Sequence, residues 1–150
     1  MKNPLEQELV NDFIENIRKR ALREGTQCSF TQVESGATAI GLPDLLMFLD
    51  NKLYWIEVKR LKNSAYSSNK GNAISTFTGE IHFRPGQVRF LHKLYNAHER
   101  VFVLALTEYS DAIIIPIFHI PLETGTVYKV KEKGADYPST YAFMKECIKE

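Results

Sequence analysis

The sequence contains two carboxylates and a lysine whose spacing could bring them together: Asp44, Glu57 and Lys59. They lie in the stretch 41–59, where two apolar runs flank a polar break, a pattern typical of a β-hairpin. If Asp50-Asn51 form a two-residue turn, residues at equal distances from it are cross-strand neighbours. Asp44 then faces Glu57 with the two Cβ atoms roughly 5 Å apart, and strand alternation turns Lys59 to the same face.

Such a pair of acids needs a positive charge. Two ionised carboxylates at this distance repel, so one takes up a proton unless a cation lies between them. Oxygen ligands suit Mg²⁺ or Mn²⁺, which combine one or two carboxylates with waters and a substrate phosphate. A metal there would polarise a phosphoryl oxygen and activate water, while Lys59 orients that water or stabilises the developing charge. The set predicts a metal-dependent phosphodiesterase.

The alternative is that Asp44 is a turn residue and that Glu57 and Lys59 form a surface ion pair, which would contribute only about 0–1 kcal/mol. The apolar character of both hairpin faces argues against this exposure. One face carries Leu46, Phe48, Leu53 and Trp55, and the other carries Leu45, Met47, Leu49, Tyr54, Ile56 and Val58. We therefore expect the hairpin to be buried in the middle of a layered domain.

Three short strings in this order resemble a known family. The sequence resembles the VRR-NUC (virus-type replication-repair nuclease) branch of the PD-(D/E)xK nuclease superfamily. The resemblance is carried by Gly41-Leu42-Pro43-Asp44, then Glu57-Val58-Lys59, then Gln87 at the start of a predicted helix. The resemblance extends from Leu5 to about Leu106. It implies an α/β, restriction-endonuclease-like fold: a mixed β-sheet with a central antiparallel hairpin flanked by helices.

The resemblance also assigns roles. It implies that Asp44 and Glu57 are metal ligands, that the Val58 backbone carbonyl is a further ligand, and that Lys59 is the catalytic lysine. Gln87 is expected to support the site. Mg²⁺ or Mn²⁺ is the expected cofactor.

Two positions have to be considered separately. Glu6 lies near the start of the first predicted helix, where an acid can reach the metal site as an outer ligand or simply complement the helix dipole. Where the family usually has a small hydroxyl residue, three positions before Gln87, this chain has Arg84. The start of that helix is therefore expected to be capped differently.

The elements that must position these residues follow from apolar periodicity. Leu5, Leu9, Phe13 and Ile17 recur at helical spacing. The sequence predicts a helix from Pro4 to about Arg23 that stops at Gly25, and a strand at Gln27–Val33. After the hairpin it predicts a helix at Pro85–Ala97, whose Val88, Leu91, Leu94 and Tyr95 face inward, and a strand at Val101–Leu106. A strand at Ala112–Ile120 is placed at an edge or bend by Pro116, and it is followed by a short strand at Val127–Val130 and a helix at Ser139–Lys149. A helix between the hairpin and the next strand implies a parallel crossover and a mixed sheet.

Between Lys62 and Pro85 the composition becomes polar. A connection of this length is often functional, and part of it, Ile74–Phe83, is expected to form a small hairpin around Thr78-Gly79. This stretch contains aromatic and basic residues that would suit an arm binding unpaired DNA, namely Tyr66, Lys70, Phe77, His82 and Arg84. The alternative is a surface insertion ordered by its own packing.

Composition sets limits on the class of protein. The chain has 150 residues with 44% hydrophobic and 25% charged, which suits one globular domain over 1–150 with the polar insertion at about 62–85. No apolar run approaches membrane-spanning length, and the N-terminus is too polar for a signal peptide. Cys28 and Cys147 are too few for a disulfide framework or a zinc cluster. We expect a cytoplasmic protein of a bacterium or of a phage-infected host cell.

Charge is informative only through its clustering. The formal net charge of +1 argues against a protein that coats DNA. Basic residues nevertheless gather around the motif, and the candidates for DNA contacts are Arg60, Lys62, Lys70, Arg84 and Arg89. Taken alone, each basic cluster favours a solvated face over a DNA contact.

These observations favour a metal-dependent DNA endonuclease. No separate sequence-reading module is recognisable, so selectivity is expected to come from DNA shape, as in homodimeric resolvases of four-way junctions. A flap or nicking nuclease stays open, as does a non-catalytic DNA-binding module that keeps the fold. A third alternative is a structural subunit that acts through the apolar strand Ile113–Ile117.

Overall fold

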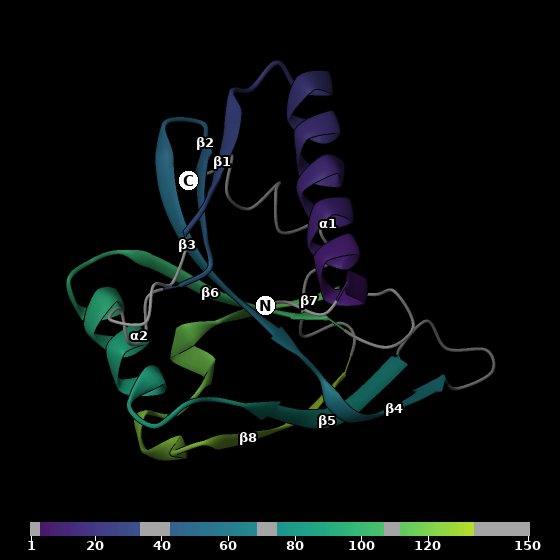
Figure 1. Ribbon diagram of the computed structural model, residues 1–150, viewed down its shortest axis with the longest axis vertical. Helices are drawn as coiled ribbons and strands as arrows, with labels where there is room; N and C mark the ends of the chain where they lie inside the picture. Colours follow the sequence, from purple (N-terminus) through teal and green to yellow (C-terminus); the bar gives the residue numbers. More distant parts are fainter. Residues whose placement is uncertain (1–3, 34–42, 69–74, 107–111, 134–150) are drawn as a thin grey trace.

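The computed structural model describes residues 4–33, 43–68, 75–106 and 112–133 (Figure 1). Their elements are α1 (Pro4–Arg23), β1 (Cys28–Gln32), β2 (Leu45–Leu49), β3 (Lys52–Arg60), β4 (Lys62–Ser68), β5 (Ser75–His82), α2 (Gln87–Asn96), β6 (Arg100–Leu106), β7 (Ala112–Pro116), the 3₁₀ helices η1 (Ile117–His119) and η2 (Leu122–Thr124), and β8 (Val127–Lys133). The helix expected at Ser139–Lys149 lies outside the described residues.

Five strands form the main sheet in the order β1-β2-β3-β6-β7. Only the β3–β6 pair of this sheet is parallel, as the crossover through α2 requires. Figure 1 shows α1 and α2 on opposite sides of the β2–β3 hairpin. The predicted fold class, a mixed β-sheet with a central antiparallel hairpin flanked by helices, is confirmed.

Strand alternation divides the apolar side chains between two cores. Tyr54, Ile56 and Val58 of β3 pack with α1 on one face of the sheet. Val103 and Ala105 of β6 pack with α2 and the second sheet on the other face. Both faces of the centre of the sheet are therefore covered, which explains why its strands are almost continuously apolar.

The hairpin has the predicted register. Asp50 and Asn51 have φ values of 54° and 61°, the left-handed conformation that a two-residue hairpin turn needs at both positions. Leu45 is paired with Ile56, as equal distance from this turn requires. The expectation that both hairpin faces are buried was wrong at Phe48, which is 46% exposed on the face of β2 opposite to the one that packs against α1.

The first helix ends as predicted. α1 stops at Arg23, and Gly25 follows with φ of 69°. The Gly25 N–H donates to the Leu22 carbonyl, and the Thr26 N–H donates to the Ala21 carbonyl at 2.8 Å. These two bonds form a Schellman motif, whose left-handed position glycine fills without strain.

Within the polar stretch 62–85, the described residues 62–68 and 75–82 form strands, and the predicted hairpin around Thr78-Gly79 was wrong. β5 pairs with β4 on one side and with β8 on the other, in a second, three-stranded sheet in the lower part of Figure 1. Gly79 lies inside β5, opposite Val130. A Cβ at this position would lie 2.6 Å from Leu61 Cγ, so the glycine serves close packing rather than a turn.

The later elements differ from the prediction in detail. α2 begins at Gln87 rather than Pro85, and Tyr95, expected to face inward, is 41% exposed. β7 lies at the sheet edge, as predicted, but it ends at Pro116 and is followed by η1 instead of continuing to Ile120. Ile113, Ile115 and Ile117 are buried within this chain. The alternative of a structural subunit acting through that strand stays a prediction. None of the described helices is long and apolar enough to cross a membrane.

Candidate active site

Asp44 is held directly before β2 by bonds to both neighbouring strands. Its backbone carbonyl accepts a hydrogen bond from the Val33 N–H at 2.8 Å. Its side-chain Oδ2 accepts from the Val58 N–H at 2.9 Å. The carboxylate is thereby fixed against β3 beside Glu57, as the hairpin register predicted.

Glu57 is a buried acid, with 3% of its surface exposed. Burial first, and then the hydrogen bond and negative charge of Asp44, raise the pKa of Glu57 from 4.5 to about 10, while Lys59 and Gln87 pull it downward. A protonated Glu57 therefore donates to the Asp44 carboxylate at neutral pH. This is the physical result expected when two acids share a dry site.

Gln87 connects the acid to the lysine. Its Nε2 donates to Glu57 Oε2 at 2.8 Å, and its Oε1 accepts from Lys59 Nζ at 2.8 Å. Oε1 also accepts from the Arg84 N–H at 3.0 Å. A single amide, 4% exposed, thus fixes both groups. The N-cap residue of α2 is Gly86, without a side-chain cap hydrogen bond, so the family's hydroxyl cap is absent from this helix as expected.

Lys59 has a second neighbour that sequence reasoning missed. Its Nζ lies 5.3 Å from the centroid of the Phe83 ring, and Phe83 is 5% exposed. A cation over an aromatic face is attracted by the ring quadrupole. The signal available in the sequence was an aromatic residue four positions before Gln87, inside a stretch that otherwise resembled a polar arm.

The second sheet is joined to the site through two of its strands, at the start of β4 and at the end of β5. β3 leaves Lys59 and passes through buried Leu61 directly into β4. β5 returns the chain through Phe83 and Arg84 to Gln87. The polar insertion is part of the scaffold that orients the lysine and the amide.

The donor set fits a hard divalent cation. Asp44 and Glu57 supply carboxylate oxygens, and the proton that Glu57 retains marks a place where positive charge is needed. No group of three or more His, Cys, Asp or Glu side chains within the described ranges could hold a metal. Water and phosphate would complete the shell, as Mg²⁺ prefers. The side chain of Glu6 lies outside the described residues, so its role stays a prediction.

The structure describes four of the five predicted DNA contacts. Lys62, Arg84 and Arg89 are exposed. Arg60 follows Lys59 on β3 and so points to the opposite face of the strand. Lys70 lies outside the described residues.

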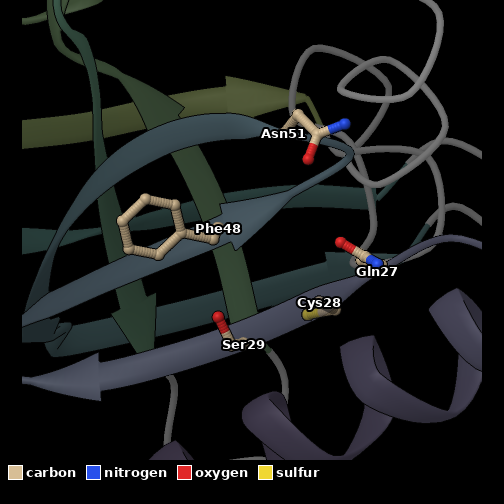
Figure 2. A pocket seen from close by; sticks show the side chains of 5 residues that line it. All are labelled: Gln27, Cys28, Ser29, Phe48 and Asn51. Atoms are coloured by element: carbon tan, nitrogen blue, oxygen red, sulfur yellow. The ribbon is translucent and has the colours of Figure 1, made fainter.

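A surface hollow of about 500 Å³ lies elsewhere, between β1 and the hairpin turn. Figure 2 shows its lining side chains, Gln27, Cys28, Ser29, Phe48 and Asn51. It is at the turn end of β2, whereas Asp44 precedes the other end of that strand. Burial raises the pKa of the Cys28 thiol, so this sulfur is not activated as a nucleophile.

Comparison with known proteins gives structural likenesses only. No family model matches the sequence, and no curated protein sequence matches it. The chain is similar to the solved structure of Hjc, a Holliday junction resolvase from the archaeal hyperthermophile Archaeoglobus fulgidus, with 16% identity over 81% of this chain and 88% of that chain and a TM-score of 0.45. It is also similar to I-Ssp6803I, a bacterial homing endonuclease, with 14% identity over 92% of this chain and 88% of that chain and a TM-score of 0.39. At these TM-scores the likeness alone assigns no function.

Proposed function

We propose that this protein is a Mg²⁺- or Mn²⁺-dependent endodeoxyribonuclease of the VRR-NUC type within the PD-(D/E)xK superfamily. The observation that carries the proposal is the closed network in which Gln87 binds both Glu57 and Lys59 while Asp44 lies against the same acid. A structural ion pair would not need two carboxylates beside each other, one of them buried. The order of helix, strands, hairpin and second helix also agrees with the sequence resemblance.

Each residue has a role in phosphodiester hydrolysis. Asp44, Glu57 and the Val58 carbonyl would hold the metal, which when bound polarises the phosphoryl oxygen and lowers the pKa of the attacking water. Lys59 is held by Gln87 and Phe83, so its ammonium group can orient that water or stabilise the charge on the phosphoryl oxygens. The water oxygen adds to phosphorus, the bond to the leaving oxygen breaks, and that oxygen takes up a proton.

The substrate we propose is branched DNA, in particular a four-way junction cut by a homodimer. Two sites related by a two-fold axis would account for paired incisions. Selectivity would come from the shape of the DNA. Exposed Lys62, Arg84 and Arg89 lie next to the network in the chain and are suited to phosphate contacts.

The test is cleavage of a labelled four-way junction beside a sequence-matched duplex and a flap, with Mg²⁺, Mn²⁺ and chelator in parallel. Glu57→Ala is the inactive control, and Glu80→Ala, an acid of the second sheet outside the network, is the matched variant that should keep activity. Symmetric, metal-dependent cuts confined to the junction would support the resolvase. Cuts in the flap or duplex alone would keep the nuclease and reject the resolvase. Tight, salt-sensitive binding without any cleavage would favour the non-catalytic DNA-binding module.

A further inference from the structure

β1 is an open edge of the main sheet. The described strands form two sheets, whose outer strands are β1, β7, β4 and β8. Three of these carry features that discourage pairing with another strand: β7 contains Pro116, β4 has an irregular register between Lys62 and Ala65, and the sequence of β8 contains three lysines. β1, with the sequence CSFTQ, contains neither proline nor charge, and its register with β2 is regular. Among the described strands it is therefore the one suited to accept a further strand.

The backbone of β1 presents its outward groups in a symmetric pattern. At its two ends, the Val33 N–H donates to the Asp44 carbonyl and the Asp50 N–H donates to the Gln27 carbonyl. Alternate residues of an antiparallel pair direct both backbone groups to the partner strand, so positions 27, 29, 31 and 33 face β2 and positions 28, 30 and 32 face outward. The outward set is centred on Phe30. A second β1 strand, antiparallel and related by a two-fold axis at Phe30, would match each outward donor with an acceptor.

One side of α1 lies beside this edge. Asn11, Glu15 and Arg18 line a hollow of about 260 Å³ together with Phe30 and Gln32 of β1. Spacings of four and three residues place the three helical side chains on one stripe, within roughly 60° around the helix axis. Glu15 and Arg18 are both exposed and carry opposite charges. The stripe therefore offers both signs of charge next to the open strand.

The same two-fold axis brings this stripe against its own copy. The Phe30 ring centroid lies 6.2 Å from that of Phe13 and 5.9 Å from the guanidinium carbon of Arg18, so Phe30 is beside the stretch 13–18 of α1. An axis at Phe30 sets the two α1 helices antiparallel with these stretches next to each other. Glu15 of each copy then lies near Arg18 of the other. Leu22, on the same stripe and 82% exposed, would pack against the second helix.

We propose that two copies of this chain pair through the outer edge of β1 into one continuous sheet, with the α1 helices side by side and Glu15–Arg18 ion pairs between the copies. The inference gives a surface to the homodimer of the proposed function and in that respect rests on it, whereas the pairing itself follows from β1 and α1 alone. A second copy fits better than an unrelated extended peptide. A peptide would satisfy the strand edge, but only a second α1 matches the charges of the stripe.

The experiment is sedimentation velocity over a range of protein concentrations, in chelator and without DNA. Glu15→Arg and Arg18→Glu each put like charges opposite one another at both contacts, so each variant alone should associate roughly 5- to 100-fold more weakly than wild type. Mixing the two variants should restore association, because the mixed pair again has an acid opposite a base at both contacts. Glu123→Arg makes the same charge change at an exposed site on η2 and should associate like wild type.

Gln32→Pro tests the strand edge separately. It removes an outward N–H and leaves the hydrogen bonds to β2, so it should weaken association, whereas Gln32→Ala should not. Thermal unfolding of each variant identifies any loss of structure, and the charge variants keep the test decisive if Gln32→Pro does not fold.

A wild type that is monomeric at every concentration would overturn the proposal. So would a mixture that associates no better than its components, or a folded Gln32→Pro variant that associates like wild type. A chain that pairs in this way but cuts no substrate would reject the nuclease and keep this inference. A monomer that cuts DNA would do the reverse.

Discussion

Gln87 and Glu57 are 30 positions apart in the chain, yet the Gln87 amide nitrogen lies 2.8 Å from the Glu57 carboxyl oxygen. The oxygen of the same Gln87 amide lies 2.8 Å from the ammonium group of Lys59. The relative position of the proposed metal ligand and the proposed catalytic lysine is thus set by one side chain at the start of α2. Changing that side chain should affect catalysis without removing either reactive group.

Gln87→Met keeps the approximate side-chain volume but removes both hydrogen bonds. We expect cleavage under single-turnover conditions to fall about 10- to 100-fold, the usual effect of losing a residue that orients a metal ligand. Thermal unfolding measured alongside would separate this effect from loss of structure. Activity within twofold of wild type would show that Gln87 does not position the site.

The buried proton of Glu57 predicts how stability depends on pH. The unfolded chain loses this proton near pH 4.5, whereas the folded chain keeps it to about 10. Between these values the folded state binds one proton more than the unfolded chain, so the metal-free protein should lose stability as pH rises, at about 1.4 kcal/mol per pH unit. Urea unfolding at pH 6, 7.5 and 9 in chelator measures this slope.

Glu57→Gln cannot ionise and should flatten that slope, giving a variant more stable than wild type at pH 9 in chelator. Glu80→Gln is the control. Interactions with His82 and Asn63 lower the pKa of the exposed Glu80 carboxyl, so it is ionised throughout this range and its removal should leave the slope unchanged. Equal slopes in wild type and Glu57→Gln would contradict a buried proton at this site.

Divalent metal binding should release that proton. We expect Mg²⁺ or Mn²⁺ affinity to rise with pH up to about 10, because the cation replaces the proton between Asp44 and Glu57. Isothermal titration calorimetry in two buffers of different ionisation enthalpy counts the protons released. Lys59→Met should retain metal binding and lose cleavage, whereas Glu57→Ala should lose both. Binding independent of pH would place the metal elsewhere.

Phe83 should position Lys59 through its ring. Phe83→Leu removes a cation–π contact of about 0.5–2 kcal/mol, so we expect cleavage to fall about 2- to 30-fold with little change in apparent affinity for DNA. Phe83→Tyr keeps an aromatic face and should keep most of the rate. A loss of equal size in Phe83→Tyr would mean that packing, not the ring face, is responsible.

The second sheet can be tested at Gly79. A methyl group there would lie within 3.0 Å of three Leu61 side-chain carbons, so Gly79→Ala should cost about 1–3 kcal/mol of unfolding free energy. In the double variant Gly79→Ala with Leu61→Ala the clash is gone. The double variant should therefore be more stable than the sum of the two single losses predicts, and strict additivity would contradict the packing described.

The hairpin and the acid pair were predictable because they depend on local rules. A two-residue turn at Asp50-Asn51 determines the register, and the register places Asp44 beside Glu57. The parallel strand β6 followed from a helix lying between two apolar strands. These inferences needed only the period of the apolar residues and the chemistry of the turn.

The second sheet was not predictable in the same way, because its β5 strand is paired on one side by β8, far along the chain. Gly79 resembles a turn residue in the sequence, and only the nearby Leu61 side chain shows why a glycine is required inside a strand. The role of Phe83 beside Lys59 was missed for a related reason. An aromatic residue in the sequence does not show whether its ring supports a cation, fills a core or faces solvent.

β4 starts three residues after Lys59, and β5 ends five residues before Gln87. At this end of the two strands, Lys62 of β4 is paired with Glu80 of β5. The lysine and the amide that we propose for the site therefore extend from the same paired end of β4 and β5. Strand pairing, rather than the length of chain between them, thus sets how far apart Lys59 and Gln87 lie.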